Sequence, residues 1–289
     1  MPVEPPIEAA GSLAEAYAAL SGSSSDDPLT PIAGGTDLMV RITGEIGEPP
    51  DRMLDLWRLD ELRGIAIEGE AMSLGALTTY TDIRGSAACR EHLPVLVEAA
   101  ATIGAAQIQN RGTLGGNIAN ASPAGDTLPV LLALDAEIVV GSGRGERSIP
   151  ASEFWIAYRK TALAADELIL RVRIPLATGR EARFRKIGTR RAQAISKVVM
   201  AVAWRDDHDA GTWRDVRVAL GSIADRPIRI EKVEAALEGR APTPEVADRA
   251  AETLAAEIQP IDDVRSTADY RRTVAARALH RIIRDAGGW

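Results

Sequence analysis

Two glycine pairs in this chain lie among residue types that could bind phosphate groups. The first lies in Pro31–Leu38, which reads PIAGGTDL, and the second in Thr113–Asp126, which reads TLGGNIANASPAGD. Because glycine has no Cβ, the backbone of such a turn can adopt positive φ and approach a ligand closely. Successive backbone N–H groups there form an anion site, and a helix that begins there adds partial positive charge.

Neither segment has the spacing of the common nucleotide-binding motifs. The sequence contains no G-x-G-x-x-G or G-x-x-x-x-G-K-[ST] pattern at these positions, so the Rossmann and P-loop fingerprints are absent from them. One glycine pair alone is typical of an ordinary turn. Two such segments in one chain predict that they bind the two phosphates of one dinucleotide from opposite sides.

In the first segment, Gly34 and Gly35 are the predicted phosphate site, and the Thr36 hydroxyl can donate to a phosphate oxygen. Asp37 has two interpretations that the residues leave open. It is either a ligand residue or the N-cap of the helix that follows.

In the second segment, Gly115 and Gly116 are the equivalent predicted site, flanked by Thr113. Asn117 offers amide donors and an acceptor, which suit a pyrophosphate or ribityl hydroxyl. Asp126 is unsuited to a phosphate because both groups are negative. We expect it to accept from a sugar or ribityl hydroxyl, with a helix cap before residue 127 as the alternative.

Composition excludes several classes of function. The 289 residues carry a formal net charge of -7, which argues against nucleic-acid binding, and no apolar run is long enough to span a membrane. The acidic, proline-rich start MPVEPP is unlike a signal peptide, so we expect a cytoplasmic protein. Cys89 is the one cysteine, which excludes an internal disulfide and a Cys-ligated iron–sulfur cluster. The three histidines have no ligand spacing, so no metal site or Ser-His-Asp site is expected, and a cofactor must bring any chemistry.

The periodicity of apolar residues divides the chain into three predicted domains, residues 1–56, 57–176 and 177–289. The first two alternate between strands and helices. The expected helices of these two are 12–20 (capped by Ser12), 37–42, 93–103 and 127–134; the expected strands are 29–33, 53–56, 65–67, 73–76, 137–141 and 167–175. The second glycine segment is expected to follow helix 93–103 directly.

The third domain changes character. Strands are expected at 198–204 and 216–223, joined by the polar turn 205–211, and helices at 228–238, 244–257 and 268–285. Antiparallel strands followed by helices predict an α+β domain.

These motifs together resemble the FAD-binding medium subunit of molybdenum hydroxylases, the family of carbon monoxide dehydrogenase and xanthine dehydrogenase. Both glycine segments are similar to the family's two FAD loops. Three later segments are similar to the family in the same order, namely Asp166–Pro175, Phe184–Val198 and Ser266–Arg272. The similarity covers nearly the whole chain.

The resemblance implies an α+β architecture: a two-subdomain FAD-binding fold of the vanillyl-alcohol-oxidase-like (PCMH) type, then a C-terminal α+β domain with a three- or four-stranded antiparallel sheet. It also implies one FAD, which we expect to be bound non-covalently because no histidine or cysteine lies near either glycine segment. The implied cofactor-binding residues are Ile32, Ala33, Gly34, Gly35, Thr36, Asp37, Leu38, Ile103, Thr113, Leu114, Gly115, Gly116, Asn117, Asp126, Ile169 and Lys186.

Three of these residues are assigned through the family alone. Ile103 corresponds to the position that packs on the adenine, although a core helix residue would look the same. Ile169 corresponds to a flavin contact, and strand alternation puts it opposite Leu168 and Leu170 on the wetter face. Lys186 corresponds to a lysine at the pyrimidine edge of the flavin, but it lies in the basic stretch 183–191, so a solvated face or a partner contact is the alternative.

By resemblance, the chain is an oxidoreductase subunit whose FAD takes electrons from [2Fe-2S] clusters on a small partner subunit. A large partner subunit would carry the molybdopterin and hydroxylate the substrate, and NAD or a quinone would accept the electrons. The expected assembly is a dimer of heterotrimers. Two alternatives are a self-sufficient FAD-dependent reductase of the same fold, which would need a general acid beside the flavin, and a non-catalytic flavin-binding scaffold.

Overall fold

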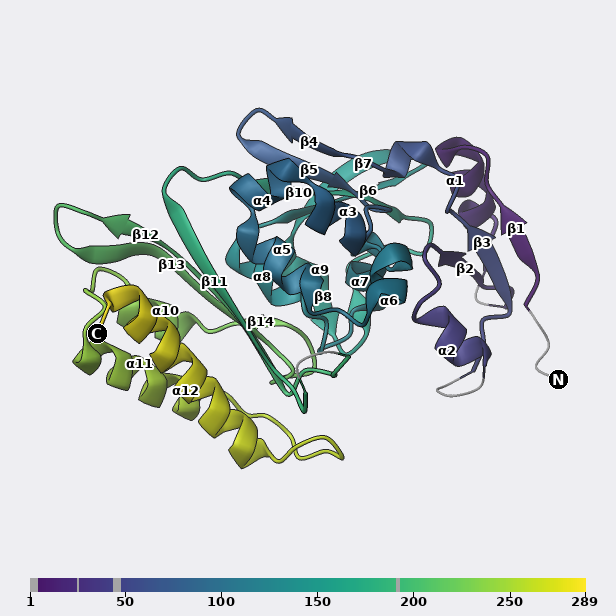
Figure 1. Ribbon diagram of the computed structural model, residues 1–289. Coiled ribbons are helices and arrows are strands. Elements are labelled where there is room, and N and C mark those ends of the chain that lie inside the picture. The colour runs from purple at the N-terminus through teal and green to yellow at the C-terminus, as the bar shows by residue number, and fades with distance from the viewer. Residues whose placement is uncertain (1–4, 25, 44–47, 191–192) are drawn as a thin grey trace.

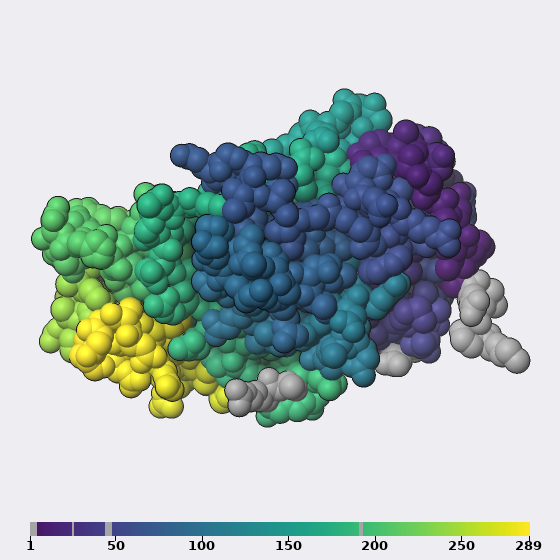
Figure 2. All heavy atoms as spheres, turned by 45° about the horizontal axis from the view of Figure 1, so that its top comes forward, coloured from purple at the N-terminus to yellow at the C-terminus, as the bar shows by residue number. Residues whose placement is uncertain are grey.

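The computed structural model describes residues 5–24, 26–43, 48–190 and 193–289, which form three parts arranged in a row (Figure 1). The middle part separates the N-terminal part from the C-terminal part, and the molecule is elongated along this row (Figure 2). No helix among the described residues is both long and apolar enough to span a membrane.

The N-terminal part contains a three-stranded parallel sheet in the order β1-β3-β2. Helix α1 begins as expected at Ser12, whose side chain accepts from the backbone N–H of Glu15 and so caps the first turn. The first glycine segment connects β2 to α2. The elements are β1 (Ile7–Ala9), α1 (Leu13–Ser21), β2 (Leu29–Ile32), α2 (Leu38–Ile42) and β3 (Arg52–Asp55).

The middle part is a five-stranded antiparallel sheet, β4-β5-β10-β6-β7, with helices packed on one face. The strands are β4 (Ile65–Glu68), β5 (Ala71–Gly75), β6 (Glu137–Ser142), β7 (Gly145–Pro150) and β10 (Leu168–Pro175), with the hairpin β8 (Trp155–Ala157) and β9 (Lys160–Thr161) beside them. The helices are η1 (Asp60–Leu62, a 3-10 turn), α3 (Tyr80–Gly85), α4 (Ala87–His92), α5 (Pro94–Ala101), α6 (Ala106–Arg111), α7 (Leu114–Asn120), α8 (Leu128–Ala133) and α9 (Ala151–Phe154).

The C-terminal part is a four-stranded antiparallel sheet, β11-β12-β13-β14, with three helices on one face (Figure 1). The elements are β11 (Arg180–Ile187), β12 (Val198–Asp207), β13 (Thr212–Gly221), β14 (Ile228–Arg229), α10 (Glu231–Leu237), α11 (Pro244–Glu257) and α12 (Ala268–Gly287). This confirms the predicted α+β domain with an antiparallel sheet, and α11 has the predicted bounds.

Strand β12 joins two hydrophobic cores because both of its faces are buried. Val199, Ala201 and Ala203 pack in the core of the middle part, which also contains α8. Val198 and Trp204, on the other face, pack against α10–α12, where Trp204 stacks on Trp213 with 4.3 Å between ring centroids. The sheet of the C-terminal part is therefore held against the middle part through α8.

Four sequence-based expectations about local structure are wrong. The second glycine segment does not follow α5 directly, since α6 lies between them. Residues 228–229 are strand β14 and not the start of a helix, because residue 228 pairs with residue 220 of β13. The turn after β12 is shorter than 205–211, since β12 extends to residue 207.

The fourth concerns Ile169, which is 6% exposed and does not lie on a wetter face. A β-bulge between Ile169 and Arg171 shifts the register of β10, so Ile169 packs in the same core as Val172 and Ile174. Leu168 and Leu170 pack against the N-terminal part.

Candidate functional site

The first glycine segment presents a row of unused backbone donors. Within the described residues, the N–H groups of residues 33–37 donate to no protein acceptor. Gly35 has φ of 75°, which favours glycine. Gly34 is needed for a different reason, because a Cβ there would lie 1.8 Å from the backbone oxygen of Arg111. The turn therefore packs closely on the end of α6 and exposes N–H groups that suit an anion.

The second glycine segment differs from the first, because its N–H groups are already used. Thr113 is the N-cap of α7, and its Oγ1 accepts from the N–H of Gly116 at 3.1 Å. The N–H groups of Leu114, Gly115 and Asn117 donate to the backbone oxygens of Thr78, Ala76 and Thr113. This segment can offer a ligand the Thr113 hydroxyl hydrogen, the Asn117 side-chain amide and the partial charge of a helix start.

The two glycines of the second segment have separate roles. A Cβ on Gly115 would lie 2.7 Å from the Cβ of Ala76, so this glycine permits close packing of α7 on the segment after β5. A Cβ on Gly116 would meet no atom within 4 Å except Thr113 Oγ1 at 2.8 Å. Gly116 therefore leaves an open approach to the backbone at the start of α7.

Asp37 and Asn120 connect the two segments. The Asn120 side-chain amide donates to Asp37 Oδ1 at 2.8 Å, and Arg159 Nη1 donates to Asn120 Oδ1 at 2.7 Å. Burial raises the pKa of Asp37, while Arg159 and Asn120 oppose the shift. Asp37 holds the N-cap position of α2 but makes no cap hydrogen bond, so its carboxylate serves this contact and not the helix.

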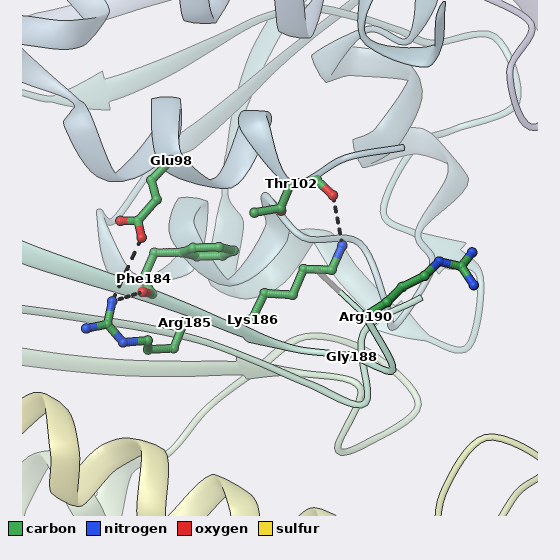
Figure 3. A pocket seen from close by; sticks show the side chains of 7 residues that line it. All are labelled: Glu98, Thr102, Phe184, Arg185, Lys186, Gly188 and Arg190. Carbon is green, nitrogen blue, oxygen red and sulfur yellow. Dashed lines mark hydrogen bonds and ion pairs between the residues drawn. The ribbon is translucent and has the colours of Figure 1, made fainter. Parts of the chain in front are cut away.

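Asp126 and Lys186 form a buried ion pair that the sequence did not indicate. Lys186 Nζ donates to Asp126 Oδ2. It also donates to the backbone oxygen of Thr102 at 3.0 Å, as Figure 3 shows. The side chains of Lys186 and Asp126 are 11% and 7% exposed. The solvated-face alternative for Lys186 is therefore wrong. So is the cap alternative for Asp126, because Thr127 holds the N-cap position of α8.

One oxygen of Asp126 lacks a partner. Within the described residues, Oδ1 is buried and accepts no hydrogen bond, whereas Oδ2 also lies 3.4 Å from the Thr102 hydroxyl. Burial raises the pKa of Asp126, and Lys186 opposes the shift. An unpaired buried acceptor is costly, so this oxygen suits a hydroxyl or N–H donor from a ligand.

Tyr80 brings the two acidic positions into one neighbourhood. Its ring packs against Gly112, where a Cβ would lie 3.1 Å from Tyr80 Cε2. Burial raises the pKa of Tyr80, and the charges of Asp37 and Asp126 raise it further. The N–H of Tyr80 donates to the backbone oxygen of Gly112, and Gly34 packs on Arg111, so the first segment and the start of α7 both lie beside this buried tyrosine.

A cavity of about 230 Å³ lies between α5 and β11, beside Lys186 (Figure 3). Its lining residues are Glu98, Thr102, Phe184, Arg185, Lys186, Gly188 and Arg190. Arg185, another residue of the basic stretch, lies 3.9 Å from Glu98 and 3.6 Å from Asp285, so its charge is paired with carboxylates of this chain. Arg191, the last residue of the basic stretch, lies outside the described residues. Ile103 directly follows Thr102, a residue that lines the cavity, and its partly buried side chain packs against the hydrophobic core.

Sequence reasoning missed one further feature near the first segment. The guanidinium groups of Arg111 and Arg63 lie over the Trp57 ring, 3.8 and 4.6 Å from the ring centroid. Leu56, the residue before Trp57, donates its backbone N–H to the backbone oxygen of Ile32, which lies in the first glycine segment. No spacing rule links these three residues, so the cluster could not be predicted from the sequence.

Two family models match consecutive parts of the chain. Residues 5–177 match the FAD binding domain in molybdopterin dehydrogenase, and residues 183–286 match the CO dehydrogenase flavoprotein C-terminal domain. The chain belongs to the FAD-binding medium subunits of molybdenum hydroxylases. It is thus an oxidoreductase subunit, and the predicted family and the α+β FAD-binding fold are confirmed.

Individual members of this family are similar over most of their length. The carbon monoxide dehydrogenase medium chain of Hydrogenophaga pseudoflava is 32% identical over 95% of this chain and 94% of its own. The nicotinate dehydrogenase FAD-subunit of Eubacterium barkeri is 37% identical over 74% of this chain and 73% of its own. Among solved structures, the Hydrogenophaga pseudoflava carbon monoxide dehydrogenase that lacks the Mo-pyranopterin moiety superposes with a TM-score of 0.91, at 33% identity, covering 97% and 96% of the two chains.

The residues present fit the FAD that defines the family. The unused N–H groups of residues 33–37 suit a phosphate, and the open face of Gly116 permits close approach. The unpaired Asp126 oxygen suits a hydroxyl or N–H donor. Among the described residues, no cluster of His, Cys, Asp and Glu could hold a metal ion.

Proposed function

We propose that this chain is the electron-transfer subunit of a molybdenum hydroxylase and passes electrons from iron–sulfur clusters of a partner to an external acceptor. Within its family it would join a large molybdopterin-binding subunit and a small [2Fe-2S] subunit, as a dimer of heterotrimers, with NAD or a quinone as acceptor. Bound FAD would supply the exchange between one-electron and two-electron carriers. The cytoplasmic location remains a prediction.

The observation that carries this proposal is the row of unused N–H groups at residues 33–37. Donors of this kind hold a diphosphate through backbone geometry, without a charged side chain. The start of α7 would face the same diphosphate with the Thr113 hydroxyl and the Asn117 amide, since helix N-termini favour anions. We propose that residues 1–56 and 57–176 form the two subdomains that hold it, with residues 177–289 closing the site.

The other proposed contacts follow from burial. Asp126 Oδ1 would accept from the ligand, and Lys186 would keep the carboxylate ionised and oriented. Ile103 and Ile169 would provide apolar contacts to ring systems. The residues proposed to contact FAD through the two glycine segments are Ile32, Ala33, Gly34, Gly35, Thr36, Asp37, Leu38, Thr113, Leu114, Gly115, Gly116 and Asn117.

Stopped-flow reduction separates this proposal from its alternatives. The chain is loaded with FAD and mixed anaerobically with the reduced [2Fe-2S] subunit, and flavin absorbance is followed. We expect loss of absorbance with that partner and none with xanthine or nicotinate alone. Reduction by an organic substrate alone would favour a self-sufficient reductase, and no reduction by either would favour a scaffold.

A further inference from the structure

Helix α8 lies between two aspartates, and each of them is paired with a basic side chain of strand β11. Asp126 precedes the helix and accepts from Lys186, and Asp135 follows it and accepts from Arg180 Nη2 at 3.3 Å. Arg180 and Lys186 lie near opposite ends of β11. All residues of α8 are buried, so side chains near the two ends of β11 contact the residues that flank a buried helix.

Three arginines of the C-terminal sheet converge on Asp135. Besides Arg180 of β11, Arg217 Nε of β13 lies 3.2 Å from Oδ1, and Arg229 Nη1 of β14 lies 3.3 Å from the same atom. Asp215 pairs with two of them, Arg180 at 2.6 Å and Arg217 at 2.8 Å. We call these five residues the Asp135 cluster. It joins the turn after α8 to three strands of the sheet.

The other end of α8 is held by the same sheet. The Ser222 N–H, just after β13, donates to the backbone oxygen of Pro123 at 2.8 Å, and the Ser196 hydroxyl donates to that of Ala124 at 3.2 Å. Arg217 therefore lies at the Asp135 end of α8, and Ser222 lies at the Asp126 end. Strands β11 and β13 therefore run in the same direction relative to α8, from its Asp135 end to its Asp126 end.

We propose that Asp135 is a positioning residue for the cofactor site, because by holding Arg180 at the start of β11 it sets where Lys186 meets Asp126. The inference rests on the proposed function, since Lys186 and Asp126 act on FAD only under that proposal. A direct field effect of Asp135 is weak, because the part of β11 between Arg180 and Lys186 spans about 20 Å. Ionic screening at physiological salt acts over about 8 Å.

The test is a double-mutant cycle read by FAD titration of the apo chain. Asp135→Asn removes the charge and keeps a residue that tolerates the φ of 51° at this position. We expect it to raise the Kd for FAD roughly three- to tenfold, and Lys186→Met to raise it about 10- to 100-fold. The double variant should match Lys186→Met within a factor of about two, because Asp135 acts through Lys186.

Two matched variants keep the test specific. Asp166→Asn removes an aspartate of the middle part that pairs with Arg144 and not with the C-terminal sheet, so it should leave the Kd unchanged. Arg180→Gln removes the arginine that Asp135 holds at the start of β11 and should raise the Kd as Asp135→Asn does. Circular dichroism at the titration temperature establishes that each variant is folded.

A second readout needs no FAD. Selective carbon labelling allows the Asp126 carboxyl to be titrated by NMR in the apo chain. Asp135→Asn should raise the pKa of Asp126 because Lys186 is no longer held against it, whereas Asp166→Asn should not change it. If wild type fails to bind FAD but this pKa shift occurs, the proposed function fails and the positioning role holds. An unchanged Asp126 pKa in Asp135→Asn, or a full additional loss of FAD affinity in the double variant, would overturn the positioning role.

Discussion

Replacing Lys186 by methionine should destabilise the apo protein in a way that depends on pH. Methionine keeps most of the length and the apolar stem of lysine but removes the cation from Asp126. Both side chains of the pair are largely buried, at 11% and 7% exposure. Removing one partner of a buried pair typically costs about 3–5 kcal/mol because the other charge is left uncompensated.

Protonation of Asp126 limits this loss at low pH. Burial raises the pKa of Asp126, so the folded chain holds that proton more tightly than the unfolded chain. A raised carboxyl pKa stabilises the fold at low pH, and this stabilisation is lost as pH rises from about 4 through the folded-state value. Without Lys186, which opposes this rise, the pKa of Asp126 should increase further. We therefore expect a loss of about 3 kcal/mol at pH 8 and about 1 kcal/mol near pH 5.

Urea unfolding followed by circular dichroism measures both values on the apo chain. Lys232→Met, which removes an exposed lysine from α10, is the control and should change the free energy of unfolding by less than about 0.5 kcal/mol. Lys186→Met combined with Asp126→Asn should recover most of the loss at pH 8. A loss below about 1 kcal/mol at pH 8, or one of equal size at both pH values, would refute the buried pair, since solvated pairs behave that way.

Four further outcomes are expected. Trichloroacetic acid should leave the yellow flavin in the supernatant, and flavin that pellets with the protein would contradict non-covalent binding. Gly116→Val should abolish FAD binding in a folded chain, because a branched side chain would close the backbone approach; full FAD content would show that the segment is misassigned. Asp126→Ala should weaken FAD binding by about 1–3 kcal/mol, seen as a larger drop in holo than in apo melting temperature. Glu167→Gln should make the free energy of unfolding depend less on pH in the acidic range. The hydrogen bond from Arg147 lowers the pKa of Glu167, so the stabilisation by this carboxylate is present above its unfolded-state pKa and is lost as pH falls below that value.

The sequence predicted elements best where caps and periodicity agree. Thr243 caps α11 just before Pro244, which favours the first helical turn, and the predicted bounds match. Helix α6 was missed because Ala106–Arg111 is short and has one buried residue, so it shows no apolar periodicity. The bulge in β10 was missed because alternation assumes a regular strand, and the face that carries Ile169 was wrongly expected to be the wetter one.

The candidate site was predictable in part. Glycine pairs mark local backbone geometry, and the Gly35 φ of 75° belongs to that kind of feature. The contact of Lys186 with Asp126 joins residues 60 positions apart and depends on how the C-terminal sheet packs on α8, which spacing rules do not address. The difference between the two segments is also tertiary, because the backbone oxygens of Ala76 and Thr78 use donors of the second segment.

Anaerobic stopped-flow mixing of the FAD-loaded chain with the reduced [2Fe-2S] subunit tests whether this chain accepts electrons from a partner. We expect flavin absorbance to be lost on mixing with this partner, and the isolated chain to oxidise neither xanthine, a nicotinic compound nor carbon monoxide. Its one cysteine cannot ligate a cluster, so those electrons must come from another subunit. Turnover of any of these substrates by the isolated chain, or a flavin that the reduced partner leaves oxidised, would contradict the proposed electron-transfer role.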